Sequence, residues 1–279
     1  MKCTMVGKIM KPVSIIFLAA TTVILLAAST AKGIGRVDDS LVMYLPLDQE
    51  KGKKVEDFSQ FKHQAEIRGG GKIVPNGAHG NCVELNGKDV IVYVPDHDAF
   101  EGGAATIEIW FKHKTASNFP IMWKEKTATG SDWWVRIEPG NNRIRYLFRD
   151  TADNVHINFT KSAYGDDKWH HMAATIGPAN EKNKISHIYI DGKIDEAGKT
   201  EIKGIFGEMK STESVTLGSR FADAPNSFGL GFLDEARVWS RVLSKEEIQT
   251  NMKLGKDSFL AVSAKVKLAT TWGYVKKTR

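Results

Sequence analysis

Two adjacent tryptophans, Trp133 and Trp134, are the residues of this sequence best suited to contact a ligand. They lie in a stretch of β-branched and aromatic residues that predicts a strand, and successive side chains of a strand point to opposite faces. One indole should therefore face the interior and the other outward, where the C–H face of a sugar ring can stack on it. Trp123 and Arg136 are close in sequence and could line the same face. We predict a ligand-binding site at these four residues. The alternative is that the outward indole packs beneath a loop or a neighbouring sheet edge.

The eight histidines lack the spacing of a metal site. His170 and His171 are neighbours in a strand-like stretch, so their side chains should point to opposite faces and cannot easily bind one ion together. The other six are scattered without the intervals typical of zinc ligands, at positions 63, 79, 97, 113, 156 and 187. The histidines therefore predict packing residues and no metal centre.

The N-terminus has the order of segments found in a secretory signal peptide. Three lysines within the first eleven residues precede an apolar run over residues 13–28, and Ser-Thr-Ala at 29–31 then supplies small residues for a cleavage site. The alternative is a membrane anchor, but the run is shorter than the roughly 20 apolar residues that a spanning helix needs. We expect residues 1–31 to be removed and the mature chain to be secreted, periplasmic or at the cell surface, with no stable membrane span.

Charge gives no reason to propose a nucleic-acid partner. The formal net charge of the whole chain is +6, but the positive excess lies in the signal peptide and in the basic C-terminal tail, residues 256–279. A folded domain without a basic surplus lacks the electrostatic footprint of a nucleic-acid-binding protein. The tail could touch an anionic surface, although charged tails are more often simply solvated. The expected partner is therefore a glycan or an envelope or extracellular protein.

The segment between signal peptide and tail, residues 32–255, has the pattern of many short β-strands. Runs of β-branched and aromatic residues are separated by turn residues, and almost none has a helical period. Tight hairpins are predicted at Asn86-Gly87, at Asp191-Gly192 and in the Pro-Gly-Asn-Asn turn at 139–142, because these residues tolerate positive φ. This pattern predicts one all-β domain, an antiparallel sandwich or barrel.

One helix is well marked near the end of this domain. Ser244 is followed three residues later by Glu247, which is the spacing of a capping box. We expect a short helix from Lys245 to about Lys253. The apolar residues 259–262 could add an edge strand beyond it.

Six strand-like blocks follow one another in a recognisable order. They are Leu45-Pro46-Leu47-Asp48, Val83-Glu84-Leu85-Asn86-Gly87, Thr106-Ile107-Glu108-Ile109-Trp110, Trp169-His170-His171-Met172-Ala173, Ile188-Tyr189-Ile190-Asp191-Gly192 and Gly231-Phe232-Leu233-Asp234-Glu235-Ala236-Arg237-Val238-Trp239. In these blocks the chain resembles the laminin-G-like jelly-roll domain of the concanavalin A-like lectin and glucanase superfamily, over roughly residues 40 to 252. The resemblance implies a two-sheet antiparallel jelly-roll sandwich, usually non-catalytic, that binds glycans or proteins. The superfamily includes both enzymes and binders.

The resemblance also gives a test for glycoside hydrolysis. Enzymes of the superfamily commonly carry Glu-x-Asp-x-x-Glu on one strand, where period two puts the first two carboxylates on the same face. No Glu of this chain is followed two residues later by Asp. We therefore predict no catalytic residues.

A structural calcium ion is the one cofactor that the resemblance implies. The superfamily often holds calcium between the first strand and the last, and Asp48 and Asp234 occupy the matching blocks. Two carboxylates together with backbone carbonyls can supply the several oxygens that calcium needs. The alternative is that Asp234 forms an ion pair with Arg237 or caps a turn.

These features predict an exported, non-catalytic binding protein. The preferred ligand is a carbohydrate, bound on a concave sheet face by aromatic stacking and polar side chains. The alternative is a protein-interaction module of an envelope or surface assembly. A diverged glycoside hydrolase is the third and least favoured interpretation, because the carboxylate strand is missing.

Overall fold

The fold comes from a computed structural model of the chain. The residues it describes are 39–102, 105–115, 117–125, 132–177, 184–197, 201–202, 207–221 and 227–261. The predicted signal peptide at 1–31 and most of the predicted tail lie outside the described residues. No helix within these ranges is long and apolar enough to cross a membrane.

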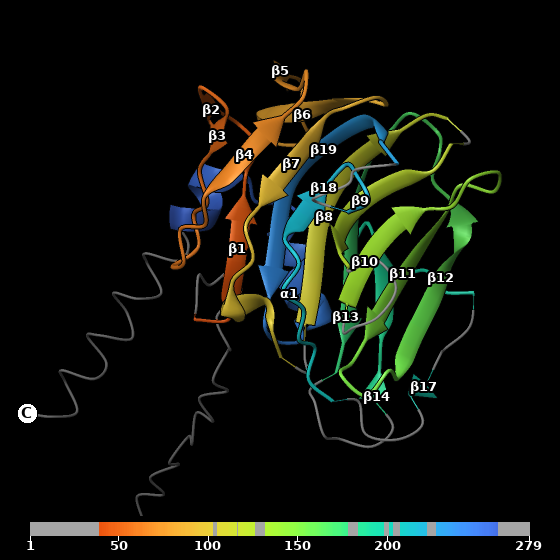
Figure 1. Ribbon diagram of the computed structural model, residues 1–279. Helices are drawn as coiled ribbons and strands as arrows, with labels where there is room; N and C mark the ends of the chain where they lie inside the picture. The colour runs from red at the N-terminus through yellow and green to blue at the C-terminus, as the bar shows by residue number, and fades with distance from the viewer. Residues whose placement is uncertain are drawn as a thin grey trace, which may run out of the picture. The chain divides into compact units, whose positions relative to one another are not determined.

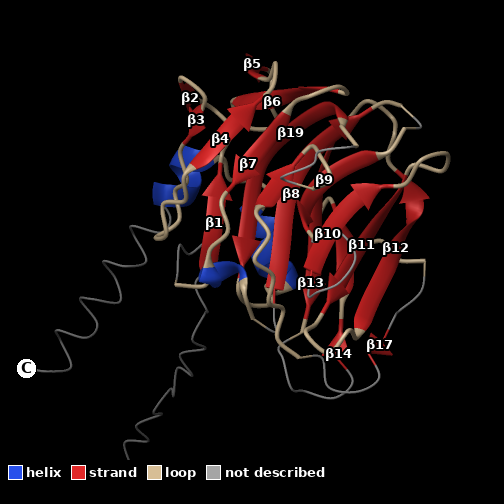
Figure 2. Ribbon diagram, viewed as in Figure 1, coloured by secondary structure: helices blue, strands red, loops and turns tan. Residues whose placement is uncertain are grey.

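Strands make up about half of the described residues, and all but two of the strands belong to two large sheets (Figure 2). The eight-stranded sheet contains β1 (Leu41–Leu45), β5 (Lys72–Pro75), β6 (Asn81–Asn86), β8 (Ala105–His113), β13 (Trp169–Ile176), β15 (His187–Ile190), β16 (Lys193–Ile194) and β19 (Leu230–Trp239). The nine-stranded sheet contains β2 (Glu50–Lys51), β3 (Lys54–Val55), β4 (Ala65–Arg68), β7 (Ile91–Val94), β9 (Phe119–Lys124), β10 (Asp132–Ile137), β11 (Arg143–Arg149), β12 (Val155–Ala163) and β18 (Val215–Leu217). A separate pair consists of β14 (Lys184–Ile185) and β17 (Glu201–Ile202). Two short helices are η1 (Asp98–Phe100) and α1 (Lys245–Asn251).

The two large sheets stack face to face as a sandwich (Figure 1). The first has the order β16-β15-β13-β8-β19-β6-β5, with β1 pairing β19 beside this path. The second has the order β12-β11-β10-β9-β18-β7-β4-β3-β2. Neighbouring strands are antiparallel throughout both sheets. The predicted antiparallel two-sheet sandwich is therefore confirmed.

Alternate side chains of the strands fill the space between the sheets. Ile107 and Phe111 of β8 and Trp133 and Val135 of β10 belong to one continuous buried cluster. Burial of a side chain of this size stabilises a fold by about 1.5–3 kcal/mol. The domain therefore has an apolar core that needs no disulfide, and Cys82 is buried as a free thiol.

The hairpin predictions hold at two of the three turns. The turn at 191–192 joins the paired strands β15 and β16, and the turn at 139–142 joins the paired strands β10 and β11. Asp191, Gly192 and Gly140 have the expected positive φ of 51°, 73° and 85°. At Asn86-Gly87 the hairpin prediction is wrong, because β6 and β7 belong to different sheets. Gly87 does have a positive φ of 72°, but that conformation does not decide which strands pair.

Helical segments cover part of the outer face of the eight-stranded sheet. The Ser244 hydroxyl accepts from the Glu247 N–H at 3.2 Å, and the Glu247 carboxylate accepts from the Ser244 N–H at 2.8 Å, which confirms the capping box. Residues 256–261 are helical, so the edge strand expected at 259–262 is wrong. A short apolar run does not by itself separate strand from helix. Phe259 is fully buried against the rings of Tyr44 and Trp239, so the packed domain extends beyond residue 255.

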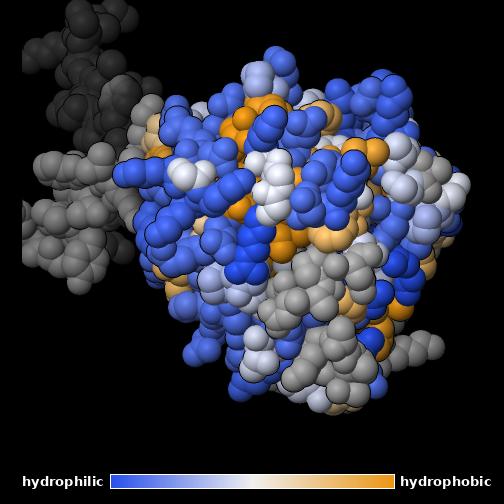
Figure 3. Space-filling view, turned by 45° about the horizontal axis from the view of Figure 1, so that its top comes forward, coloured by the Kyte–Doolittle hydropathy of each residue, from blue (hydrophilic) through white to orange (hydrophobic). Residues whose placement is uncertain are grey.

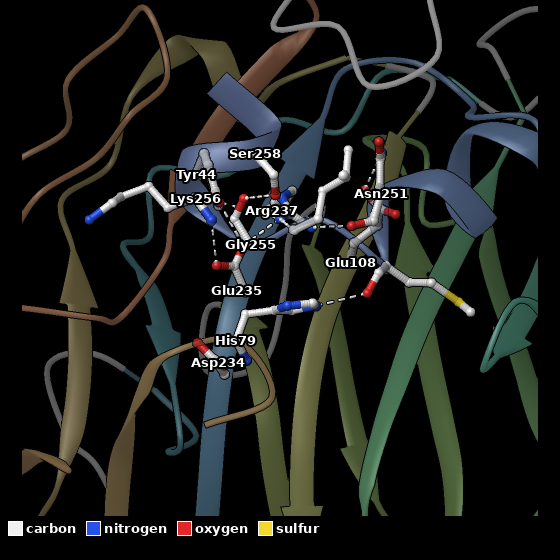
Figure 4. Close-up of polar contacts among 12 residues, drawn as sticks. Tyr44, His79, Glu108, Asp234, Glu235, Arg237, Asn251, Gly255, Lys256 and Ser258 are labelled. Atoms are coloured by element: carbon white, nitrogen blue, oxygen red, sulfur yellow. Dashed lines mark hydrogen bonds and ion pairs between the residues drawn. The ribbon is translucent and has the colours of Figure 1, made fainter. Parts of the chain in front are cut away.

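A buried polar network joins this helical cover to the sheet (Figure 4). Arg237 of β19 donates to the Glu235 carboxylate and to the Leu254 carbonyl oxygen, the latter at 2.8 Å. Glu108 of β8 accepts from the side-chain amide of Asn251 at 3.0 Å. Arg237, Glu235 and Glu108 are all fully buried, and buried charges of this kind are stable only when they are paired.

Candidate ligand-binding face

Two stacked indoles form the floor of the candidate site, on the outward face of the nine-stranded sheet. Trp123 of β9 and Trp134 of β10 pair across the strands, and their ring centroids lie 4.7 Å apart at an interplanar angle of 3°. The indole N–H of Trp123 donates to Glu125 Oε2 at 2.7 Å. That of Trp134 is buried and has no hydrogen-bond partner. The pair therefore leaves one unused donor beneath this face.

Two arginines lie on the Trp134 ring and share one carboxylate. The guanidinium carbons of Arg136 and Arg145 are 5.3 and 5.1 Å from the ring centroid, within the range of cation–π attraction. Glu138 accepts from Arg136 at 2.8 to 3.0 Å and from Arg145 Nη1 at 3.3 Å. The side chains of Arg136, Arg145 and Glu138 remain 20%, 26% and 14% exposed. The solvent therefore meets charged groups, with the aromatic ring beneath them.

The same arrangement continues onto β12. The Phe159 ring has the guanidinium carbons of Arg145 and Arg143 at 5.3 and 5.7 Å from its centroid. Arg143 Nε donates to the carbonyl oxygen of Thr160 at 2.5 Å, which fixes this side chain along the strand. Three guanidinium groups thus lie on two aromatic side chains.

A fourth guanidinium lies at the other end of the indole pair. The guanidinium carbon of Arg220 is 5.2 Å from the Trp123 ring centroid and 4.3 Å from that of Phe221. Arg220 Nε is 3.4 Å from Glu125 Oε2, and the side chain is 38% exposed. We call the surface formed by Trp123, Trp134, Arg136, Glu138, Arg143, Arg145, Phe159 and Arg220 the arginine–indole face.

The structure brings three of the four predicted binding residues together on this face. Trp123, Trp134 and Arg136 are neighbours, while Trp133 points into the core between the sheets. The prediction that one of the two adjacent indoles faces inward is confirmed. Trp133 therefore cannot line the face, and its place in the predicted site is corrected.

Neither outward indole is the bare platform that the sequence led us to expect. Trp123 is 1% exposed and Trp134 is 5% exposed. A bare indole would leave a large apolar surface in water. Here Leu147 and Phe221 pack with the two indoles in one buried cluster, and the arginine side chains lie over the rings while keeping their charged heads wet. A ligand on this face therefore meets guanidinium groups first.

Sequence reasoning missed Arg143, Arg145 and Glu138. A usable signal was present, because residues 143 to 149 read Arg-Ile-Arg-Tyr-Leu-Phe-Arg. Alternation puts the odd positions of this strand on one face. The partner of each arginine could not be read in the same way, because it depends on how β11 pairs with β10.

Asp48 and Asp234 lie together at the loop before β6, where both accept hydrogen bonds from its backbone. Asp48 Oδ1 accepts from the Asn81 N–H at 2.9 Å, and Asp234 Oδ2 accepts from the His79 N–H at 2.9 Å. Lys256 Nζ is 3.7 Å from Asp48 Oδ2. Of the two alternatives for Asp234, an ion pair with Arg237 is wrong, because Arg237 pairs with Glu235 instead.

One feature of this loop fits a cation. Asp234 Oδ1 is buried without a hydrogen-bond partner. Burial, together with the charges of Glu235 and Asp48, raises the pKa of Asp234 to about 8. A bound cation would offset the free energy needed to ionise this buried carboxyl group. Among the described residues, however, no group of three or more His, Cys, Asp or Glu side chains could hold a metal ion. Calcium at Asp48 and Asp234 would thus depend on carbonyl oxygens, and it stays a prediction.

Chelation tests the calcium prediction. EDTA should lower the melting temperature of the full chain by several degrees, because a ligand that binds only the folded state stabilises it by about 2.7 kcal/mol at a hundredfold excess over its Kd. Asp234→Asn should abolish this difference, whereas Asp153→Asn, at a side chain that is 81% exposed, should preserve it. A melting temperature that is the same in calcium and in EDTA would remove calcium from the account.

The adjacent histidines point to opposite faces of the eight-stranded sheet, as predicted. His170 lies against Phe111 of the core and is held by Asp191 at 2.9 Å. His171 lies against Trp110 on the outer side and is fully buried. The two imidazoles therefore cannot share one ion.

A cavity of about 420 Å³ lies at the opposite edge of the nine-stranded sheet, beside β2 and β3. Most of the residues that line it are polar or charged, among them Gln49, Lys51, Lys54, Glu56, Lys62 and Gln64. A cavity of this size could hold a small polar ligand. None of the predicted binding residues lines this cavity, so it is a second candidate site that binding experiments must distinguish from the first.

The visible surface offers little apolar area for a partner protein. The side turned to the viewer in Figure 3 is mostly hydrophilic, with hydrophobic residues in small patches between charged ones. Among the described residues, the exposed large hydrophobic side chains are Val155 of β12, Ile194 of β16, Leu230 of β19 and Val242 of the loop between β19 and α1. Single exposed hydrophobic residues are normal for a protein surface.

Comparison with known families identifies the group to which this fold belongs. A family model described as the concanavalin A-like lectin/glucanases superfamily matches residues 86–249. The chain belongs to this superfamily. The sandwich of this concanavalin A-like protein and the order of its strand blocks agree with that assignment. No curated protein matches the chain significantly.

Solved structures that are similar to the chain include ligand-binding and receptor-binding domains. The chain is similar to the binding domain of Paraclostridial Mosquitocidal Protein 1, with 16% identity and a TM-score of 0.59 over 78% of this chain and 52% of that one. It is also similar to the botulinum neurotoxin serotype D ligand binding domain in complex with N-acetylneuraminic acid, with 16% identity and a TM-score of 0.57 over 77% and 51%. The chain spans about half the length of these solved chains. At this identity the likeness shows the fold alone.

Proposed function

We propose that this concanavalin A-like protein is an exported, non-catalytic binding protein that recognises carbohydrate on the arginine–indole face. The observation that carries the proposal is the pair of guanidinium groups, Arg136 and Arg145, placed on the Trp134 ring. Guanidinium groups present several N–H donors in one plane, which suits the closely spaced oxygens of a saccharide. Because the ring and Glu138 already hold them, binding costs less conformational entropy than it would for free side chains.

The comparisons support a binding role for this fold. The similar solved structures are receptor-binding or ligand-binding domains, and one of them is a complex with N-acetylneuraminic acid. That complex does not locate a sugar on this chain, which covers only 51% of the solved one. The predicted signal peptide supports export, and the missing Glu-x-Asp-x-x-Glu strand supports a non-catalytic role.

A glycan array tests the proposal directly. The chain without its predicted signal peptide, residues 32–279, should bind a defined group of glycans. Arg145→Gln should weaken that binding about tenfold to a hundredfold, because a hydrogen bond from a charged donor contributes about 1.5–3 kcal/mol. Apparent affinity on serial dilutions is the readout, and the melting temperature of each variant confirms folding.

Arg68→Gln is the matched control. Arg68 also lies on an aromatic ring, that of Tyr93, and also pairs with a glutamate, Glu66. It belongs to β4, four strands away from β10 in the same sheet and therefore roughly 19 Å distant. Its substitution should leave glycan binding unchanged. A blank array from a folded protein would contradict the proposal and would favour a protein-interaction module instead.

A further inference from the structure

Positive charge exceeds negative charge on the arginine–indole face. Arg136 and Arg145 both use Glu138 as their carboxylate partner. Arg143 lies beside them on the Phe159 ring and has no acidic partner in the part of the chain that the structure describes. Two of the three guanidinium groups therefore share one carboxylate and the third has none among the described residues, so this part of the sheet carries a local positive excess.

Two of these arginines lie directly opposite each other. Arg136 of β10 pairs with Arg145 of β11 in the strand register. Like charges directly opposite each other on neighbouring strands destabilise a sheet, and Glu138 offsets only one of the two charges. An anion bound between the guanidinium groups would offset the remaining charge, so the arrangement is better explained by an acidic ligand than by the stability of the sheet.

The donors that Glu138 leaves unused are guanidinium N–H groups, the kind of donor that suits an acidic group. Glu138 occupies Nε and Nη2 of Arg136 and Nη1 of Arg145. Nη1 of Arg136 and Nη2 of Arg145 have no protein acceptor among the described residues, and both side chains reach solvent. Every basic residue of β10 and β11 is arginine and none is lysine. Guanidinium forks match carboxylate and sulfate groups, which lysine binds only as a point charge.

The depth of the indoles argues against a neutral ligand. A neutral sugar gains much of its affinity from stacking on an accessible ring, but Trp123 and Trp134 are only 1% and 5% exposed. The charged side chains that are more exposed on this part of the face are the arginines, at 20% for Arg136 and 26% for Arg145 against 14% for Glu138. We infer that the saccharide bound on the arginine–indole face is acidic, with carboxylate or sulfate groups that the arginines recognise; this inference rests on the proposed function.

Isothermal titration calorimetry tests the inference by measuring the affinity of residues 32–279 for matched pairs of saccharides. Oligogalacturonate is compared with its neutral methyl ester, and dextran sulfate with dextran. We expect at least one acidic member to bind at least tenfold more tightly than its neutral partner, and this affinity to fall as salt is raised. The two pairs distinguish carboxylate from sulfate as the recognised group.

Variants then assign the binding to the face. Arg145→Lys keeps the charge but loses the fork and should weaken binding about tenfold, Arg145→Gln should weaken it further, and Arg68→Gln should not change it. The acidic and neutral saccharides could bind with equal affinity, and Arg145→Gln could abolish the binding of both. This result would overturn the inference of an acidic ligand and would leave the proposed function standing. Acidic binding that is the same in all three variants would place the anion elsewhere, for example on the basic segment 262–279, and would overturn the inference. If the folded protein binds none of the four saccharides and the glycan array is blank, the proposed function itself fails.

Discussion

Replacing Arg237 by methionine should lower the free energy of unfolding by about 3–5 kcal/mol, because removal of one partner of a buried ion pair leaves an uncompensated charge. Arg237 is fully buried, and its guanidinium carbon lies 4.6 Å from the centroids of both the Tyr44 and Phe259 rings. Burial raises the pKa of Glu235, and the nearby Arg237 charge opposes that rise. Without the arginine, the folded state must keep Glu235 neutral or bury its charge. Urea unfolding at pH 7 measures the loss.

Arg241→Met is the control for this prediction. Arg241 also pairs with a glutamate, at 2.8 Å from Glu247, but its side chain is 30% exposed. Partly exposed ion pairs contribute about 0–1 kcal/mol, so the loss should stay below about 1 kcal/mol. Equal losses in free energy of unfolding for the two variants would show that the burial of Arg237 does not make its ion pair more important than an exposed one.

His156 should make the stability of the domain depend on pH. Its side chain is buried on β12 and bonded to the Ser186 hydroxyl, and burial lowers its pKa to about 4. In the unfolded chain a histidine titrates near pH 6.5. Between these values the unfolded state binds a proton that the folded state does not, so stability is lost as pH falls from about 6.5 to about 4. At about 1.4 kcal/mol per pH unit, this amounts to about 3 kcal/mol.

Other groups also titrate in this pH range. The contribution of His156 is therefore measured as the difference in free energy of unfolding between the wild type and a His156 variant. His156→Gln keeps a hydrogen-bonding group for Ser186 and removes the ionisation. We expect it to be less stable than the wild type at pH 7.5 and to lose about 3 kcal/mol less on transfer to pH 4.5. A gap between His156→Gln and wild type that does not change with pH would refute the role of His156.

The local features of the fold could be predicted because they depend on near neighbours in the sequence. Strand alternation correctly placed one of the two adjacent tryptophans inside and the other outside. The spacing of Ser244 and Glu247 correctly predicted the start of α1, because a capping box involves only four consecutive residues. The hairpin at Asp191-Gly192 likewise joins strands that are next to each other in the chain.

The features that could not be predicted from the sequence depend on how strands pair across the sheet. The cover over Trp134 comes from Arg145, which is opposite Arg136 only because β10 and β11 pair in one particular register. A shift by one residue would have turned the arginines of β11 into the core. In the same way, nothing local to Asn86-Gly87 reveals that the chain crosses there from one sheet to the other. Sequence reasoning therefore found the indoles but not the charged layer that changes what they can bind.

Hydrogen–deuterium exchange with and without a saccharide selected on the array shows where on the sandwich the ligand binds. We expect slower exchange of backbone amides in β10, β11 and β12, with no change at β4. Protection confined to β2 and β3, beside the 420 Å³ cavity, would contradict the account. It would show a carbohydrate-binding protein whose site is not the arginine–indole face.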